Sequence, residues 1–191
     1  MPIPKKLITY LEQNKIKYEI LEHRTVYTAF DLASTLKLKL SEIAKTLVIK
    51  ADKEYYLVVL PAHYRLELTK LKKVLNVKKI SIANENVMQK VFNVKPGAIT
   101  PFGSIHKTQV VIDRSLLKSP RVLMGSGSFS ESVAMKIKDF TKLEEPIEGV
   151  FGKRFTSDVI AKPKLQNKKK GVKKKKAVKK YPTKRKTKKK K

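Results

Sequence analysis

The sequence predicts an α+β (mixed α/β) fold, in which a mostly antiparallel or mixed β-sheet is flanked by helices and followed by a disordered basic tail. Helix-like and strand-like segments mix along the chain without the regular βαβ alternation of a parallel sheet. Two apolar runs, 46–50 and 55–60, are continuous rather than alternating, which is typical of central strands covered on both faces. We expect residues 1–157 to form one domain and residues 158–191 to remain outside it.

The first elements are predicted from apolar spacing and capping residues. Apolar side chains recur at helical spacing within 4–13, and a strand is expected over 18–22. Thr28, with the acidic Asp31 three residues later, is expected to cap a short helix that runs to Thr35.

The centre of the chain should hold a hairpin and a further helix. Ser41 is expected to cap a helical turn across Ile43 and Ala44. The polar segment 51–54 predicts the loop of a hairpin between the two apolar runs. An amphipathic helix is predicted over 66–75.

The remaining elements of the body alternate with turns. Asn84 is expected to cap a helix that reaches Phe92, and the two Pro and two Gly of 95–103 predict an irregular loop. The later elements are expected as strands at 109–113, 121–124 and 132–136, a turn at 125–128, and a helix at 137–143.

Positive charge is concentrated at the C-terminal end. The chain carries a net charge of +29, and residues 162–191 hold 17 Lys, one Arg and no acidic residue. Such a segment has too little apolar surface to fold and indicates an arm that binds a polyanion, with nucleic acid as the expected partner. Its alternative role is a solubilising or nucleoid-associating extension. The residues expected to contact nucleic acid are Lys168, Lys169, Lys170, Lys173, Lys174, Lys175, Lys176, Lys179, Lys180, Lys184, Arg185 and Lys186.

Several classes of site and location are excluded. The absence of Cys excludes disulfides, thiolate metal sites and a cysteine nucleophile. His23, His63 and His106 lie far apart without matching ligands, so we expect structural or surface roles and no metal site. No apolar run is long enough to span a membrane and the N-terminus does not resemble a signal peptide, which predicts a cytoplasmic protein.

Lys45 directly precedes the first apolar strand and is the main candidate for chemistry. The alternative is a lysine whose apolar stem lies along a sheet edge while its ammonium reaches water. The functional interpretation is favoured by the order of elements: the Thr28 cap, Lys45, a Gly-x-x-x-Pro loop at 97–101, and a Gly-Ser pair before a strand.

Four blocks of this sequence resemble one known family. Residues 22–29 (EHRTVYTA), 43–48 (IAKTLV), 96–103 (PGAITPFG) and 125–128 (GSGS) are similar, in order, to signature blocks of the YbaK/prolyl-tRNA-synthetase-associated editing domain family. The resemblance implies a partly rolled mixed sheet. It also implies a trans-editing aminoacyl-tRNA deacylase, which hydrolyses the ester between a wrongly attached amino acid and the end of tRNA.

The resemblance also implies roles for individual residues. Lys45 would hold the terminal adenosine or its phosphate, and loop backbone would surround the amino acid and the attacking water, assisted by the terminal hydroxyl of the tRNA and without a cofactor. The loop residues with this catalytic role would be Gly97, Ala98, Ile99, Thr100 and Pro101. The residues expected to bind the substrate are Tyr27, Thr28, Phe30, Thr46, Gly127, Ser128 and Phe129.

Two departures bear on specificity and activity. Phe129 occupies a position at which some relatives have His, which argues against a general base there. Thr46 after the lysine favours a Cys- or Ala-tRNA(Pro) substrate, with prolyl-tRNA synthetase as a further partner and DNA as an alternative ligand of the tail. The competing functions are a non-catalytic module that binds tRNA or DNA and, less favoured, a histone-like protein that compacts DNA.

Overall fold

The computed structural model describes residues 3–155. The predicted tail lies outside these residues, and so does the predicted boundary between 157 and 158, so both stay predictions. Within the described part, the mixed α+β class is confirmed, with sheets that contain antiparallel and parallel pairs and do not close into a barrel.

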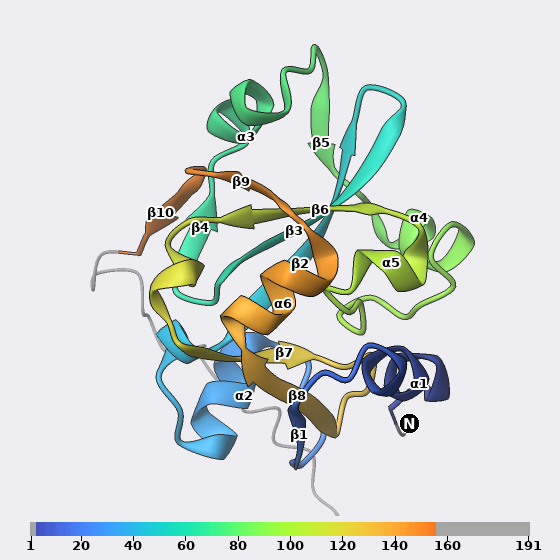
Figure 1. Cartoon of the computed structure of the whole chain (residues 1–191). Coiled ribbons are helices and arrows are strands. Elements are labelled where there is room, and N and C mark those ends of the chain that lie inside the picture. The colour runs from blue at the N-terminus through green and yellow to red at the C-terminus, as the bar shows by residue number, and fades with distance from the viewer. Residues whose placement is uncertain (1–2, 156–191) are drawn as a thin grey trace, which may run out of the picture. The chain divides into compact units, whose positions relative to one another are not determined.

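The larger sheet has five strands in the order β5-β2-β3-β6-β9 (Figure 1). Its strands β2 and β3 form an antiparallel hairpin, whereas β3–β6 and β6–β9 pair in parallel. The turn of the hairpin contains only Asp52 and Lys53, because Ala51 and Glu54 are already strand residues, so the predicted loop was too long. The bounds are β2 Ala44–Ala51, β3 Glu54–Pro61, β5 Ile80–Ile82, β6 Gln109–Asp113 and β9 Ile147–Gly149.

Two smaller sheets complete the β-structure. A three-stranded antiparallel sheet has the order β1-β8-β7, and β4 pairs with β10. A single parallel bridge from Ile43 to Leu123 places the start of β2 beside β7. The bounds are β1 Tyr18–Glu22, β4 Tyr64–Leu66, β7 Arg121–Gly125, β8 Glu131–Lys136 and β10 Gly152–Arg154.

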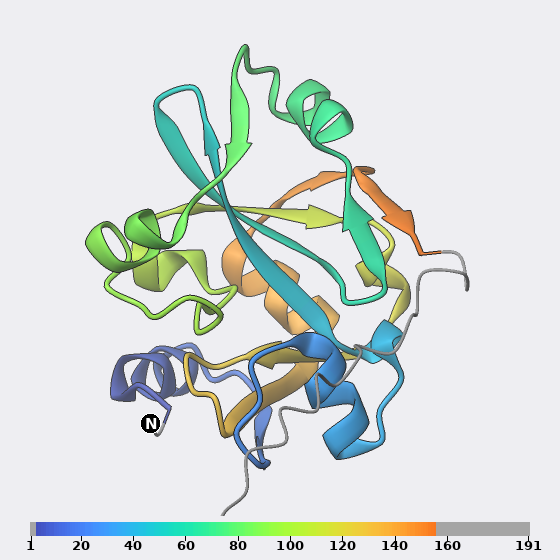
Figure 2. The same cartoon turned by 180° about the vertical axis from the view of Figure 1, so that it is seen from behind.

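Helices surround and separate these sheets. In Figures 1 and 2, α6 lies between the five-stranded and the three-stranded sheets, and its buried Ile137 and Phe140 join the core between them. The bounds are α1 Lys5–Gln13, α2 Ala29–Leu36, α3 Leu68–Leu75, α4 Glu85–Lys90, α5 Gly103–His106 and α6 Ile137–Glu144, with 3-10 turns at Leu40–Glu42 and Leu116–Lys118.

Several predicted boundaries were wrong. The helix capped by Asn84 ends at Lys90 and does not reach Phe92. Ser41 does not cap a turn across Ile43 and Ala44: it lies inside the 3-10 turn, and Ala44 begins β2 because its backbone pairs with Pro61. Leu66 belongs to β4 rather than to a helix, since it pairs with Gly152, and α3 begins at Leu68.

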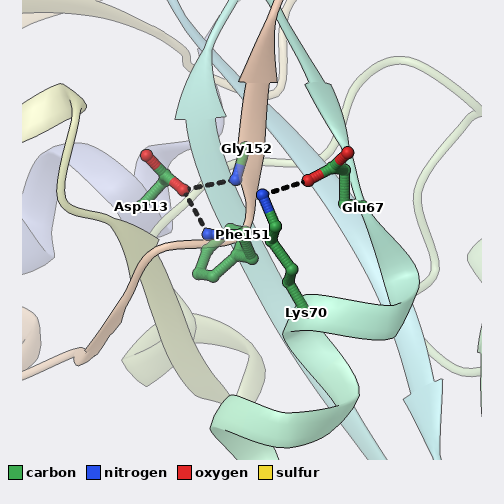
Figure 3. Close-up of polar contacts among 5 residues, drawn as sticks. All are labelled: Glu67, Lys70, Asp113, Phe151 and Gly152. Atoms are coloured by element: carbon green, nitrogen blue, oxygen red, sulfur yellow. Dashed lines mark hydrogen bonds and ion pairs between the residues drawn. The ribbon is translucent and has the colours of Figure 1, made fainter.

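Asp113, at the end of β6, holds the connection between β9 and β10. One carboxylate oxygen accepts hydrogen bonds from the backbone N–H groups of Phe151 (2.8 Å) and Gly152 (2.6 Å), as Figure 3 shows. The other oxygen accepts from the backbone N–H (2.9 Å) and the hydroxyl of Ser115. Asp113 is buried, and it therefore fixes the path by which the chain reaches Phe155.

Candidate functional site

The Gly-x-x-x-Pro loop has a fixed shape with a buried interior. Gly97 has φ +85°, a conformation that favours glycine, and a side chain there would approach the Tyr27 carbonyl and the Phe129 ring. Ile99, Thr100 and Pro101 are buried. The loop is therefore anchored through its later residues.

The turn after β7 lies against this loop. Gly127 has φ +92°, and a Cβ there would lie 3.4 Å from the Thr100 methyl group. Ser128 is buried; its N–H donates to the Ser126 hydroxyl (3.2 Å) and its own hydroxyl accepts from the Ser130 N–H (3.1 Å). The loop and the turn, which are far apart in the sequence, thus come together at Thr100 and Gly127.

A cavity of about 810 Å³ opens on one side of these two segments. Four predicted site residues line it: Ala98, Thr100, Gly127 and Phe129. Its other lining residues are mostly apolar or basic and come from α1, α4 and α5 with their flanking loops: Pro4, Lys6, Leu7, Gln89, Val91, Phe92, Asn93, Val94, Lys95, Ile105, His106 and Lys107. The volume lies within the range of small-molecule sites, and no acidic residue lines it.

Lys45 lies on β2 and points away from this cavity. Its ammonium donates hydrogen bonds to the carbonyl oxygens of Ala62 (3.4 Å) and Tyr64, and lies 5.5 Å from the centre of the Phe155 ring. Burial, and secondly the charge of Arg65, lower the pKa of Lys45. Within residues 3–155 no carboxylate pairs with it, so carbonyl oxygens and an aromatic ring stabilise its charge in place of an acidic partner.

Thr46 points to the opposite face of β2 from Lys45, because successive side chains alternate along a strand. Ala44 and Val48 share the face of Thr46 and pack in the main core with Ile99. Thr46 is therefore positioned toward the core side of the sheet rather than beside the Lys45 ammonium.

The segment from Tyr27 to Phe30 connects the loop with Lys45. The Tyr27 ring lies 5.1 Å from that of Phe129, and the Phe30 ring lies 6.3 Å from that of Phe155, which also covers Lys45. Tyr27 is 70% exposed and Phe30 is 43% exposed, so both rings present aromatic surface to solvent. Bases of single-stranded nucleic acid stack on such surfaces.

Thr28 has a structural task in the same segment. As predicted, it is the N-cap of α2: its hydroxyl accepts from the Asp31 N–H (3.1 Å) and donates to the Asp31 carboxylate (2.7 Å). The cap fixes the start of α2, with Tyr27 before the helix and Phe30 in its first turn. Thr28 thus shapes the site through the backbone.

His106 also lines the cavity, a position that the sequence analysis did not predict. Its Nε2 lies 3.5 Å from the Thr100 hydroxyl, and its ring meets that of Phe92 edge to face with centres 5.7 Å apart. Burial, and secondly the charge of Lys6, lower the pKa of His106, so that the neutral ring predominates at pH 7. No local motif marks His106, because its neighbours at the cavity come from distant segments.

The other two histidines lie elsewhere. His23 contacts the Ser132 hydroxyl through Nε2 and the Arg24 carbonyl through Nδ1, both at 2.9 Å. His63 packs edge to face against Tyr64, and burial lowers its pKa. No group of three potential metal ligands occurs within residues 3–155, and no helix of this part is long and apolar enough to cross a membrane.

The chain is similar to known proteins in family, sequence and fold. The model of the aminoacyl-tRNA editing domain matches residues 23–143. The chain is 28% identical over 149 residues to the prolyl-tRNA editing protein ProX of Acetoanaerobium sticklandii, covering 75% of this chain and 91% of that protein. It is 33% identical over 81 residues to a proline–tRNA ligase of Staphylococcus saprophyticus, but this match covers 42% of the chain and only 14% of the ligase.

Solved structures agree with the fold. A protein described only as hypothetical superposes with a TM-score of 0.73 at 21% identity, covering 78% of this chain and 99% of that one. A candidate trans-editing enzyme for prolyl-tRNA synthetase superposes with a TM-score of 0.69 at 20% identity, covering 78% and 96%. Because the family model spans more than half of the sequence, the chain belongs to the aminoacyl-tRNA editing domain family, and the predictions of its fold and of an enzyme of the aminoacyl-tRNA deacylase class are confirmed.

Proposed function

We propose that this protein removes a wrongly attached amino acid from tRNA(Pro) in trans, with Cys- or Ala-tRNA(Pro) as substrate. The observation that carries the proposal is the meeting of the 97–101 loop, the turn at Gly127 and the exposed Tyr27 ring within the family match. The curated relative named as a prolyl-tRNA editing protein supports tRNA(Pro), and Thr46, which follows Lys45 in the sequence, supports the Cys or Ala type.

Lys45 is proposed to attract the 3′ end of the tRNA. A half-buried ammonium without a carboxylate partner gains more from an anion than an exposed, hydrated lysine does. The terminal phosphate or ribose would replace the weak contact to the Ala62 carbonyl. The exposed rings of Tyr27 and Phe30 would hold the terminal base by stacking.

The 97–101 loop is proposed to hold the ester. Hydrolysis of an aminoacyl ester needs a positioned hydroxyl or water and stabilisation of the oxyanion, because the ester is already activated. Attack on the ester carbonyl breaks its bond to the ribose oxygen, which takes a proton and leaves as the free terminal hydroxyl. Backbone N–H groups near Gly97 would stabilise the oxyanion without a cofactor, and Phe129 would contribute apolar surface rather than a base.

The tail is proposed to tether tRNA while the body selects the acyl group. Eighteen positive charges attract phosphates without sequence preference, and even about 5 phosphate contacts at roughly 0.7 each give a log–log salt slope near −3.5. A prolyl-tRNA synthetase in the cytoplasm is the proposed supplier of mischarged tRNA. DNA is the alternative ligand of the tail.

Deacylation of Cys-, Ala- and Pro-tRNA(Pro) tests the proposal. We expect the wild type to hydrolyse Cys- or Ala-tRNA(Pro) and to leave Pro-tRNA(Pro) intact. Lys45→Met keeps the apolar stem but removes the charge, so kcat/KM for Cys- or Ala-tRNA(Pro) should fall about 10- to 100-fold. Lys50→Met is the matched control, because Lys50 is an exposed lysine on the same strand. Truncation after residue 157 should weaken tRNA binding and flatten its salt dependence.

The opposite pattern supports the competing function. If the wild type hydrolyses none of the three substrates faster than buffer does, while binding of tRNA or DNA depends on the tail and not on Lys45, the protein is a non-catalytic binding module. If the tail alone compacts DNA and the body is dispensable, it is a histone-like protein.

A further inference from the structure

We propose that His106 is a positioning residue, whose neutral imidazole holds the Thr100 hydroxyl and thereby fixes the 97–101 loop. This inference rests on the proposed function of the loop in ester hydrolysis. Thr100 is buried, and His106 is the last residue of α5, the helix that follows the loop.

The hydrogen bonds around Thr100 leave its hydroxyl able to donate to His106, and we assign the bond in this direction. The Thr100 hydroxyl oxygen accepts the backbone N–H of Phe102 at 3.4 Å, so its own hydrogen remains to be donated. His106 Nε2 is 3.5 Å away and accepts this hydrogen only when it carries no proton. The contact is long, as hydrogen bonds near a site often are before the substrate binds, and we expect it to shorten in the complex.

The helix that carries His106 is itself held in place. Glu144 of α6 accepts hydrogen bonds from the N–H (3.0 Å) and hydroxyl (3.2 Å) of Ser104, and its other oxygen accepts from the Tyr10 hydroxyl (2.9 Å). A side chain at Gly103 would come within 2.1 Å of the Thr108 carbonyl oxygen, so α5 lies directly against the start of β6. A short helix fixed at its first turn presents His106 in one orientation.

The surroundings keep the imidazole neutral. Phe92 covers one edge of the ring, and Lys6 from α1 disfavours a second positive charge. Lys95 from the loop before α5 and Lys107, next in the chain, line the same cavity. The carboxylate of Glu144 accepts hydrogen bonds from Ser104 and Tyr10 rather than from the His106 ring.

Holding Thr100 fixes its neighbours in the loop. The carbonyl of Ile99 faces Gly125 of β7, where a Cβ would lie only 3.2 Å from it. A displaced Thr100 would therefore move backbone on the side of the loop that faces Phe129 and Tyr27. The effect should appear in the chemical step, whereas tRNA binding, which depends on charge, should change little.

A double-mutant cycle between His106 and Thr100 tests this coupling. His106→Phe keeps an aromatic ring that cannot accept a hydrogen bond, and Thr100→Val removes the hydroxyl. Each should lower kcat about 5-fold with KM unchanged, and the double variant should be no worse than either alone. His106→Gln places an amide oxygen that can accept and should restore most of kcat. Thr108→Val is the control, because its hydroxyl donates to the His106 carbonyl rather than to the ring.

The pH profile and a measurement on the free protein complete the test. After subtraction of uncatalysed hydrolysis, wild-type kcat should fall below the lowered pKa of His106, and the Gln variant should lack this fall. NMR titration of His106 should give a higher pKa in Thr100→Val than in the wild type, because the hydroxyl stabilises the neutral ring.

These readouts separate the two proposals. Multiplicative losses in the double variant, or an unchanged His106 pKa in Thr100→Val, would overturn the positioning role even if the enzyme deacylates tRNA. An inactive wild type in which Thr100→Val still raises the His106 pKa would overturn the proposed function while retaining the contact.

Discussion

Replacement of Asp113 should destabilise the protein far more than its single charge suggests. Its carboxylate accepts three backbone N–H groups and one hydroxyl, and one of those groups belongs to the fully buried Phe151 (Figure 3). An unsatisfied buried donor costs about 1–3 kcal/mol, whereas Gly152 and Ser115 are partly exposed and can recruit water. With about 2 kcal/mol for the Phe151 donor and about 0.7 kcal/mol for each of the three bonds from Gly152 and Ser115, we expect Asp113→Ala to lower the free energy of unfolding by about 4 kcal/mol. Asp113→Asn, which keeps one acceptor oxygen, should lower it by about 2 kcal/mol.

Urea unfolding followed by circular dichroism measures this difference. With a slope of about 2 kcal/mol per molar urea, the Ala variant should unfold at a midpoint about 2 M below the wild type. Lys70→Ala is the control from the same region: it removes the Lys70–Glu67 ion pair of Figure 3, whose lysine side chain is 53% exposed, and should cost about 0.5 kcal/mol at most. The reasoning is refuted if the Asp113→Ala midpoint lies no lower than that of Lys70→Ala.

Two further predictions concern the anchoring of α5. Gly103→Ala should lower the free energy of unfolding by about 2–3 kcal/mol in thermal or urea unfolding, because a methyl group would overlap the Thr108 carbonyl. A variant as stable as the wild type would show that the helix can shift freely. Burial raises the pKa of Tyr10 to about 12, so its hydroxyl should ionise only near pH 12. The difference in phenolate absorbance between the wild type and Tyr10→Phe should therefore be absent below about pH 11. Tyr10→Phe should also cost about 1 kcal/mol through the lost bond to Glu144, and a difference titration centred near pH 10 would contradict the buried position.

The long elements could be predicted because their signals are local. Thr28 and Asn84 cap the helices that follow them, and the apolar hairpin strands lie where the sequence placed them, apart from their ends. The three-residue strands β4, β5, β9 and β10 were missed, because they are too short to show periodicity and exist only through pairing with distant segments, as Leu66 does with Gly152. The failure at Ser41 has the same cause, since pairing with β3 decides that Ala44 is extended.

The candidate site divides in a similar way. The loop and the turn were identifiable from Gly and Pro residues and from the family resemblance, and the structure brings Gly97, Gly127 and Phe129 close together. Lys45 was predicted to lie directly before the first strand, but it is the second residue of β2, with its ammonium on the Phe155 side of the sheet. Neither Phe155 nor His106 carries a local signal, because each reaches the site through contacts that only the folded chain creates.

The pairing of β1 with β8 has a consequence for the time at which the enzyme becomes active. Tyr18 pairs with Met135, so the first strand cannot complete its sheet until most of the body has been synthesised. Chains with such long-range pairings fold slowly, because the entropy cost of closing the loop comes before the contacts that offset it. We expect the editing site to appear late in refolding, after the local helices have formed. During synthesis, the nascent chain should gain activity only once β10 has left the ribosome, since Phe155, at the end of the described residues, lies against Lys45.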